Sequence, residues 1–163
     1  EDVIAQIRRY NPFADIIECR HRPVHFQNIH TGERLPLDAF RGKYVGALSG
    51  IAVPESFENG CRKLGAKVHW TARFTDHHRF QEKEITQFID RCIKADAHAI
   101  LTTEKDYVRF PKLEPTEVPI YFLRVEIEIT RGKEIFERLV ELIAQPRHVT
   151  QGLISAELVE PSE

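Results

Sequence analysis

The sequence predicts an α/β fold with a mostly parallel sheet and flanking helices, preceded by a small β-rich arm. After Gly42, apolar segments typical of buried strands alternate with segments of helical periodicity. Such alternation indicates parallel strands that are joined by right-handed crossovers. The chain has 163 residues, of which 42% are hydrophobic and 29% charged, so it can bury a core of its own.

The lead-in section, residues 1–41, is expected to contain a short helix followed by the β-rich arm. The helix candidate covers residues 3–10 and ends at Asn11-Pro12. Three strand candidates follow, over residues 16–19, 24–29 and 34–37. We expect these strands to lie apart from the main sheet.

The main unit is expected over residues 42–146, and residues 147–163 form a C-terminal tail. Four apolar strand candidates cover residues 44–48, 68–74, 97–101 and 120–129. A helix is expected from Pro54, which suits a first helical turn, to Gly65, which suits the position after a helix. A second helix is indicated by the spacing of Ile85, Phe88, Ile89, Cys92 and Ile93. A last helix is expected to end near Pro146.

Composition excludes several classes of protein. A net charge of −2 provides no basic field for nucleic acid, so no nucleic-acid partner is expected. The apolar runs are far shorter than the roughly 20 residues that a membrane-spanning helix needs, and no secretory signal opens the chain. Three widely spaced cysteines favour a reducing, cytoplasmic compartment. Because the chain contains no methionine, we expect it to be a soluble fragment of a longer protein.

Two polar clusters follow apolar strands. Asp76-His77-His78 follows the strand at 68–74, and the cluster at residues 102–106 follows the strand at 97–101. In an open α/β sheet, ligands bind in the crevice beyond the carboxyl ends of the strands. Neighbouring strands would place six residues along one rim, namely Asp76, His77, Thr103, Glu104, Lys105 and Asp106. This combination suits a nucleotide or a phosphate.

Each candidate site supports two interpretations from its residues alone. His77 could orient or deprotonate a nucleophile, because imidazole titrates near neutral pH; alternatively, Asp76 caps the following helix and the histidines are surface residues. Residues 103–106 could hold a nucleotide base, or they form a capped turn with a solvated face. Ser49-Gly50 resembles a backbone site for an anion, although the glycine could simply allow a tight turn.

Two kinds of site are missing from the sequence. The chain lacks the C-x-x-C and H-E-x-x-H spacings, so no metal site is expected. It also lacks the loop G-x-x-x-x-G-K-[ST], which wraps the phosphates of a nucleoside triphosphate. The sequence therefore predicts half of an active site, namely the polar rim without a loop that wraps phosphates.

Three ordered motifs give the chain a resemblance to a known family. Residues 42–57 resemble the strand–GI-x-P-x-x-F segment of tetraacyldisaccharide 4′-kinases, a family of lipid A biosynthesis. Residues 74–78 resemble the F-x-D-H-x motif of that family, and residues 101–106 are similar to its L-T-T-E-K-D signature. The similarity runs over residues 10–143 and covers only the C-terminal half of such kinases. Arg109 stands at a position that is commonly lysine and keeps the charge.

The resemblance implies the Rossmann-like lobe of a two-lobed, P-loop-type kinase. Such an enzyme transfers the γ-phosphate of ATP, with Mg²⁺, to the 4′-hydroxyl of a tetraacylated disaccharide 1-phosphate, the lipid A precursor. It is a peripheral protein at the cytoplasmic face of the inner membrane. The P-loop, the metal-binding acids and the membrane contact belong to the N-terminal half. This fragment is therefore expected to be inactive alone and to bind no cofactor tightly.

The same resemblance implies roles for the six candidate residues. His77 pairs with an aspartate of the missing N-terminal lobe to deprotonate the sugar hydroxyl. Asp76 orients the loop that carries His77. The segment Thr103-Glu104-Lys105-Asp106 lies near the nucleotide.

Two other classes of protein remain open at this point. A D-H-H triplet also marks a superfamily of metal-dependent phosphoesterases, but these enzymes need further aspartates to hold two metal ions. Upstream of the triplet, Asp2, Asp15 and Asp38 form no D-x-D pair. The other alternative is a non-catalytic nucleotide-binding or interaction domain that lacks the P-loop lobe. A P-loop-bearing half encoded upstream would distinguish the kinase from this alternative.

Overall fold

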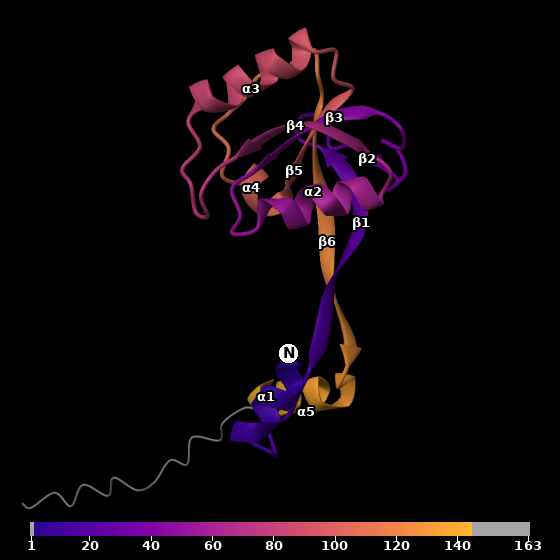
Figure 1. Cartoon of the computed structure of the whole chain (residues 1–163), viewed down its shortest axis with the longest axis vertical. Coiled ribbons are helices and arrows are strands. Elements are labelled where there is room, and N and C mark those ends of the chain that lie inside the picture. Colours follow the sequence, from indigo (N-terminus) through magenta and orange to yellow (C-terminus); the bar gives the residue numbers. More distant parts are fainter. Residues whose placement is uncertain (1, 145–163) are drawn as a thin grey trace, which may run out of the picture. The chain divides into compact units, whose positions relative to one another are not determined.

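The computed structural model describes residues 2–144, which fall into two compact units (Figure 1). Residues 20–128 form the larger unit, and residues 2–19 with 129–144 form the smaller unit. The tail expected at residues 147–163 lies outside the described residues.

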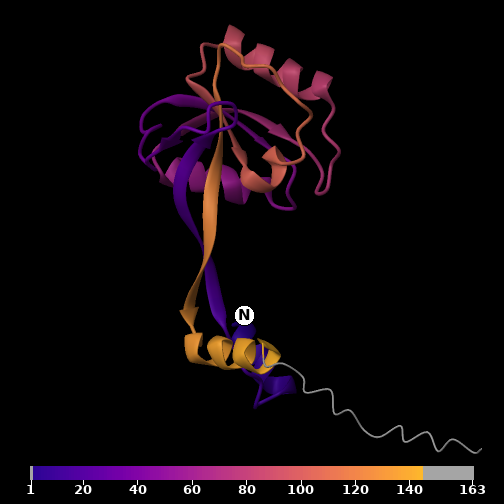
Figure 2. The ribbon, with the colours of Figure 1, turned by 180° about the vertical axis from the view of Figure 1, so that it is seen from behind.

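The larger unit is built around a sheet with helices on both faces (Figures 1 and 2). The strands are β1 (Glu18–Asn28), β2 (Arg34–Leu35), β3 (Tyr44–Ser49), β4 (Lys67–Arg73), β5 (Ala99–Thr103) and β6 (Ile120–Arg131). The helices of this unit are α2 (Pro54–Lys63), α3 (Glu82–Lys94) and α4 (Glu104–Tyr107). The smaller unit contains α1 (Val3–Tyr10), α5 (Lys133–Ala144), the start of β1 and the end of β6. None of the helices that the structure describes is long and apolar enough to cross a membrane.

The strand order β2-β1-β6-β5-β3-β4 confirms the predicted α/β class. β3 pairs in parallel with β4 and with β5, and β5 pairs in parallel with β6, whereas β1 and β2 are antiparallel. The chain passes from β3 through α2 to β4, and then crosses back through α3 to β5 on the other side of β3. The order of the strands therefore reverses at β3. Such a switch point opens a crevice beyond the carboxyl ends of the central strands.

The lead-in strands differ from the prediction, because they belong to the main sheet and not to a separate arm. Next to β6, the Ile29 N–H donates to the Ile120 carbonyl over 3.1 Å. The strands expected at 16–19 and 24–29 are one strand, β1, which runs through Pro23. Proline is tolerated there because the two-residue β2 leaves one side of β1 open at that position. The pairing also gives partners to backbone groups of β6 that an open edge would expose.

Two hydrophobic clusters cover the two faces of the sheet. Along β3, Val45 packs with Phe57 and Cys61 of α2, while Leu48 packs with residues of α3 on the opposite face. Cys92 of α3 is fully buried as well. Burial raises the pKa of the Cys61 thiol to about 12 and that of the Cys92 thiol to about 11. Both cysteines therefore stay protonated at neutral pH and pack as small hydrophobic side chains, as the sequence predicts.

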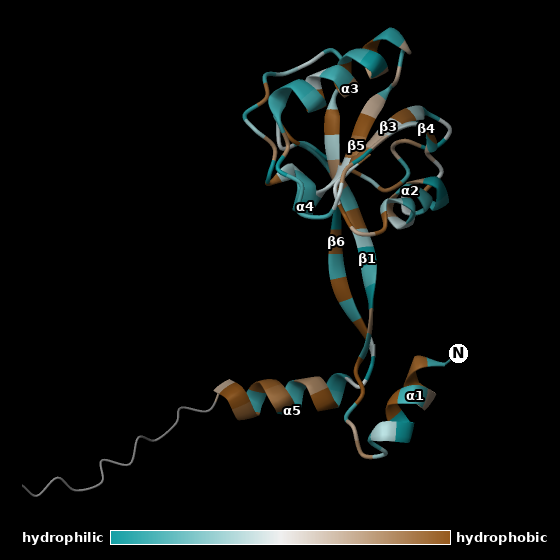
Figure 3. Ribbon diagram, turned by 60° about the vertical axis from the view of Figure 1, so that its left-hand side comes forward, coloured by the Kyte–Doolittle hydropathy of each residue, from teal (hydrophilic) through white to brown (hydrophobic). Residues whose placement is uncertain are grey.

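The smaller unit exposes the apolar sides of its helices. No hydrophobic side chain among its described residues is buried. Apolar residues are spread along α5, as Figure 3 shows. The exposed large hydrophobic residues are Val3, Ile7, Tyr10, Phe13, Phe136, Leu139, Val140, Leu142 and Ile143. Ion pairs join Asp15 to Arg138 at 2.9 Å and Glu18 to Arg131 at 3.3 Å. The described residues of this unit therefore form ion pairs but no hydrophobic core.

The close approach of α3 to β3 generates a prediction about Gly46. A Cβ atom at this position would lie 2.7 Å from Cys92 Sγ and 3.1 Å from Phe88 Cζ, both of α3. We expect Gly46→Ala to lower the free energy of unfolding by about 1–3 kcal/mol, because the packed core has no room for the added methyl group. Urea denaturation followed by circular dichroism measures the change.

Gly60 provides the matched control for this prediction. It lies within α2, and a Cβ atom added there would meet nothing within 4 Å. We expect Gly60→Ala to raise the free energy of unfolding by about 0.5–1 kcal/mol, because alanine is the better helix former. If Gly46→Ala stabilised the protein as Gly60→Ala does, the described packing of α3 on β3 would be wrong.

Candidate functional site

Polar residues gather beyond the carboxyl ends of three neighbouring strands. β4 ends at Arg73, β3 at Ser49 and β5 at Thr103, with β3 in the middle. The two polar clusters of the sequence therefore flank the end of one central strand. One contact joins them directly, because Lys105 Nζ donates to Asp76 Oδ1 over 2.8 Å.

Asp76 lies at the rim, with 34% of its side chain exposed. The hydrogen bond from Lys105 lowers the pKa of the Asp76 carboxyl, and the nearby His77 acts in the same direction. Partial burial opposes this shift but does not outweigh it. Asp76 is therefore a carboxylate at neutral pH, held by a cation from the other cluster.

His77 has an unusual backbone conformation. Its φ angle is +61°, in the left-handed region that favours glycine. The His77 N–H donates to Asp76 Oδ1 over 3.1 Å, and its Nε2 atom lies 3.5 Å from Asp76 Oδ2. The imidazole is 80% exposed. Strained residues of this kind cluster at functional sites, and each costs on the order of 1–3 kcal/mol. The turn thus presents an accessible imidazole beside a carboxylate.

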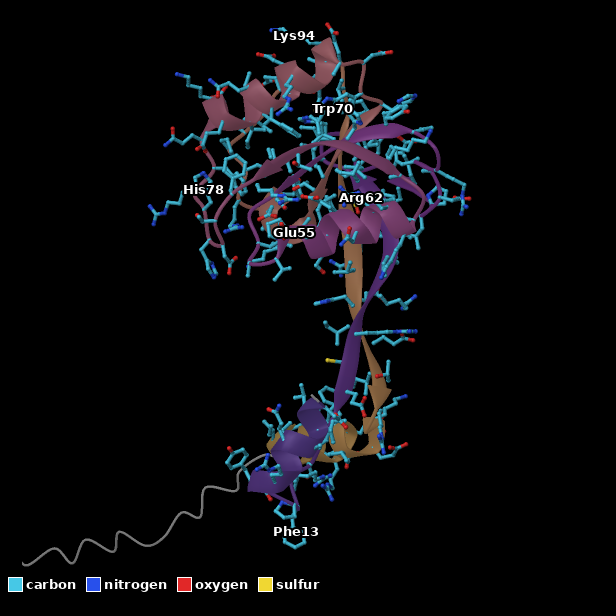
Figure 4. The ribbon with its side chains drawn as sticks, in the orientation of Figure 1. Phe13, Glu55, Arg62, Trp70, His78 and Lys94 are labelled. Carbon is cyan, nitrogen blue, oxygen red and sulfur yellow. The ribbon has the colours of Figure 1, made fainter. Side chains whose placement is uncertain are left out.

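His78 has a different environment from His77. Its ring stacks on Phe74 with 4.8 Å between the ring centroids, and its Nε2 atom lies 2.8 Å from Glu84 Oε2 (Figure 4 labels His78). Glu84 also accepts from the Gln81 N–H in the capping box of α3. The N-cap of α3 is therefore Gln81, so the alternative that Asp76 caps this helix is wrong. His78 anchors the loop to α3.

Residues 103–106 form the end of β5 and the short helix α4, whereas the sequence predicts that the strand ends at residue 101 and predicts no helix after it. Thr103 is the N-cap of α4, and its Oγ1 accepts from the Asp106 N–H over 3.1 Å. Glu104 pairs with Arg124 of β6. Thr103 spaced three residues before an acidic residue is a helix-start pattern, and this signal could have predicted α4. The structure does not test nucleotide binding by these residues, which stays a prediction.

Asp106 is fully buried at the centre of the site. Its Oδ2 accepts from the Gly50 N–H over 3.0 Å and from Thr103 Oγ1 over 2.7 Å, and its Oδ1 pairs with Arg109. The Gly50 N–H therefore binds a carboxylate of the chain itself, and the binding of a ligand anion at Ser49-Gly50 stays a prediction. From the sequence, Arg109 is noted only because it keeps the positive charge of a position that is commonly lysine. The structure shows that its guanidinium pairs with the buried Asp106 carboxylate. The alternative of a capped turn is correct in that Thr103 caps the Asp106 N–H. The Asp106 side chain is buried, however, and not exposed to solvent as that alternative predicts.

A cavity of about 570 Å³ opens next to α4. Its lining includes His30, Tyr107 and Phe110, but none of the six predicted site residues.

Among the residues that the structure describes, no group of three or more His, Cys, Asp or Glu side chains could hold a metal ion. The carboxylates of the rim are instead engaged by Lys105, Arg109 and Arg124. These residues therefore do not fit a magnesium ion.

Comparisons with known proteins give one consistent family. The sequence model of the family described as Tetraacyldisaccharide-1-P 4'-kinase (LpxK) matches residues 3–144. A tetraacyldisaccharide 4'-kinase of Elusimicrobium minutum is 32% identical over 145 residues, which cover 88% of this chain and 37% of that protein. A tetraacyldisaccharide 4'-kinase of Anaeromyxobacter sp. strain Fw109-5 is 36% identical over 118 residues, which cover 72% of this chain and 32% of that protein. The chain thus spans about a third of the length of these relatives.

One solved structure is also similar. It is the "apo" form of LpxK from Aquifex aeolicus in complex with ATP, with 19% sequence identity and a TM-score of 0.48. The match covers 83% of this chain and 40% of that one.

The buried carboxylate generates a prediction about stability. Asp106→Ala removes the partner of Arg109 and leaves the Gly50 N–H without an acceptor. We expect the free energy of unfolding to fall by about 3 kcal/mol, because unpaired buried polar groups are costly. Thermal and urea unfolding measure the loss. Asp90→Ala on the exposed side of α3 is the control, with an expected change within about 0.5 kcal/mol. Equal effects of the two substitutions would contradict a buried role for Asp106.

The His78–Glu84 contact generates a prediction about pH. The hydrogen bond from His78, followed by that from the Gln81 N–H, lowers the pKa of Glu84 in the folded protein. Its stabilising contribution is therefore fully present above the ordinary glutamate pKa of about 4.3, and it is lost as the pH falls through the lower, folded pKa. We expect Glu84→Gln to flatten the decline of stability between about pH 5 and pH 3. Urea unfolding across this range measures the slope.

Glu82→Gln on the same helical turn is the control for the pH prediction. It leaves the His78–Glu84 contact in place, so the variant should decline as the wild type does. A Glu84→Gln variant with the slope of the wild type would show that the contact is not formed in solution.

Proposed function

Because the chain belongs to the tetraacyldisaccharide-1-P 4'-kinase family, we propose that it is the C-terminal lobe of an ATP-dependent lipid kinase. The whole enzyme would phosphorylate the 4'-hydroxyl of a tetraacyldisaccharide 1-phosphate in lipid A biosynthesis. The contact between Lys105 and Asp76 is the observation that carries the proposal, because it brings both polar clusters to one rim of the sheet. The comparisons do not favour a phosphoesterase or a non-catalytic domain.

The proposed role of His77 is that of a general base. Its exposed imidazole is free to approach a sugar hydroxyl. The Asp76 carboxylate lies 3.5 Å from His77 Nε2 and would hold the ring in a fixed orientation while it accepts the proton. An aspartate of the other lobe would complete the base, which would take the proton as the hydroxyl oxygen bonds to the γ-phosphorus of ATP. The bond from that phosphorus to the β,γ-bridging oxygen would break, and ADP would leave. Asp76 orients this group and does not itself receive the proton. Residues 103–106 remain the proposed nucleotide side of the rim.

The remaining parts of the reaction are assigned to the rest of the protein. Phosphoryl transfer depends on a phosphate cradle and on neutralisation of charge at the transferred group. The 163 residues contain no G-x-x-x-x-G-K-[ST] loop. ATP and Mg²⁺ would therefore be held chiefly by the N-terminal P-loop lobe, and the 163-residue chain alone would be inactive.

The proposed partner of the smaller unit is that same N-terminal lobe. The apolar sides of α1 and α5 are exposed, and the curated relatives are about three times as long as the matched segment. Large exposed apolar patches mark surfaces that bind another protein domain or a membrane. The acyl chains of the proposed substrate would place the enzyme at the cytoplasmic surface of the inner membrane, with the N-terminal lobe in contact with the lipid.

Substitution of His77 in the full-length kinase tests the proposal. We expect His77→Ala to lower kcat about 10²–10⁴-fold, as loss of a general base does, with a much smaller change in KM for ATP. Steady-state phosphorylation of the disaccharide 1-phosphate with radiolabelled ATP measures both constants. The 163-residue chain in the same assay should show no transfer above the His77→Ala background.

His78→Ala is the matched comparison for this experiment. His78 contacts Phe74 and Glu84, so its loss should lower the melting temperature and reduce kcat less than His77→Ala does. Equal losses of kcat in the two variants, or an effect of His77→Ala on ATP affinity alone, would rule out the assigned base.

A further inference from the structure

Arg109 ties the short helix α4 to the end of β3. Its Nη2 pairs with the buried Asp106 carboxylate and donates to the Gly50 carbonyl over 3.2 Å. Its Nε donates to the Lys105 carbonyl over 3.2 Å, and its guanidinium carbon lies 5.6 Å from the centre of the Phe80 ring. The forked guanidinium makes these contacts at the same time, which the single ammonium of a lysine cannot do. The backbone of Lys105 is thereby held at a fixed place on the rim.

From this fixed backbone, the side chain of Lys105 reaches across to the other cluster. Its Nζ donates to Asp76 Oδ1, the same oxygen that accepts from the His77 N–H. His77 is the residue with the left-handed backbone conformation. A chain of contacts therefore runs from the buried Asp106, through Arg109 and Lys105, to the turn that carries the exposed imidazole.

Stability does not account for the Lys105–Asp76 pair. Half of the Lys105 side chain and a third of the Asp76 side chain are exposed. Exposed ion pairs contribute about 0–1 kcal/mol, because solvent screens them and both side chains lose conformational freedom. In contrast, a strained residue such as His77 persists only where its surroundings over-determine its conformation. Lys105 contacts the Asp76 oxygen that also accepts from the His77 N–H, so it is placed to contribute to this restraint.

We propose that Lys105 is a positioning residue, whose ammonium group fixes the Asp76 carboxylate and thereby the turn that presents His77. Lys105 acts through Asp76 and touches neither substrate nor nucleotide in this proposal. The inference rests on the proposed function only for the role of His77 in the reaction, and for Lys105 it replaces the proposed place on the nucleotide side of the rim with a positioning role. It differs from the interpretation of Lys105 as a nucleotide ligand, and the two make opposite predictions for enzyme kinetics.

The first test uses the 163-residue chain and requires no enzyme activity. Carbon-detected NMR follows the Asp76 carboxyl through an acid titration in the wild type and in Lys105→Met, Lys105→Arg and Lys112→Met. In the wild type, the hydrogen bond from Lys105 holds the pKa of Asp76 below its ordinary value. Lys105→Met should raise the midpoint towards the ordinary aspartate value of about 3.9, and Lys105→Arg should keep it low.

Lys112→Met controls for the loss of one positive charge. Lys112 is 93% exposed, and its nearest acidic partner is Glu114 at 3.9 Å. Its substitution should leave the Asp76 midpoint at the wild-type value. An Asp76 midpoint that is the same in Lys105→Met and in the wild type would overturn the proposal.

The second test separates positioning from nucleotide binding in the full-length kinase. Misplacement of a catalytic group by about 1 Å can cost on the order of 10²-fold in rate. Lys105→Met should therefore lower kcat on this scale and leave KM for ATP nearly unchanged, and Lys105→Arg should recover most of the rate. A rise in KM for ATP with kcat intact would identify Lys105 as a nucleotide ligand instead and refute the proposal.

The two tests fail independently. If the full-length wild type phosphorylates no disaccharide, then the proposed function is wrong, while the Asp76 titration still decides whether Lys105 positions the carboxylate. If the titration is unaffected by Lys105→Met in an active kinase, then the positioning role is wrong and the kinase assignment stands.

Discussion

The buried carboxylate of Asp106 holds together the ends of the two central strands. It binds the Gly50 N–H after β3, the Thr103 hydroxyl at the end of β5 and the guanidinium of Arg109. A buried carboxylate is stable only when its lone pairs and its charge are all matched, and here three groups share that task. Because every partner comes from the rim of the sheet, the geometry of the rim depends on this one group.

The site combines a rigid side and a strained side. On the rigid side, α4 is capped by Thr103 and tied to β3 through Arg109. On the strained side, the turn at His77 has a left-handed backbone and an exposed ring. The aromatic contacts of His78 with Phe74 hold the base of this turn. A rigid frame around one strained and accessible side chain is the arrangement that preorganised chemistry requires.

The two units differ in how they are stabilised. The larger unit buries hydrophobic clusters on both faces of its sheet, while the described residues of the smaller unit bury no hydrophobic side chain. Ion pairs such as Asp15 with Arg138 are exposed and contribute little stability by themselves. The amphipathic α1 and α5 therefore leave apolar side chains exposed, which the proposed N-terminal lobe would cover.

The sequence by itself determined the α/β class, the strands β3 to β6 with the helices α2 and α3, the burial of Cys61 and Cys92, and the rim where Asp76 and residues 103–106 meet. These features follow from periodicity and chain order, which are local properties. Only the tertiary structure decided that β1 joins the main sheet, that Gly50 binds Asp106 and that Lys105 binds Asp76. Gly50 and Asp106 are 56 residues apart in the sequence, and Asp76 and Lys105 are 29 residues apart. No local pattern encodes such contacts, because the direction of a long side chain is set only once the elements around it have packed.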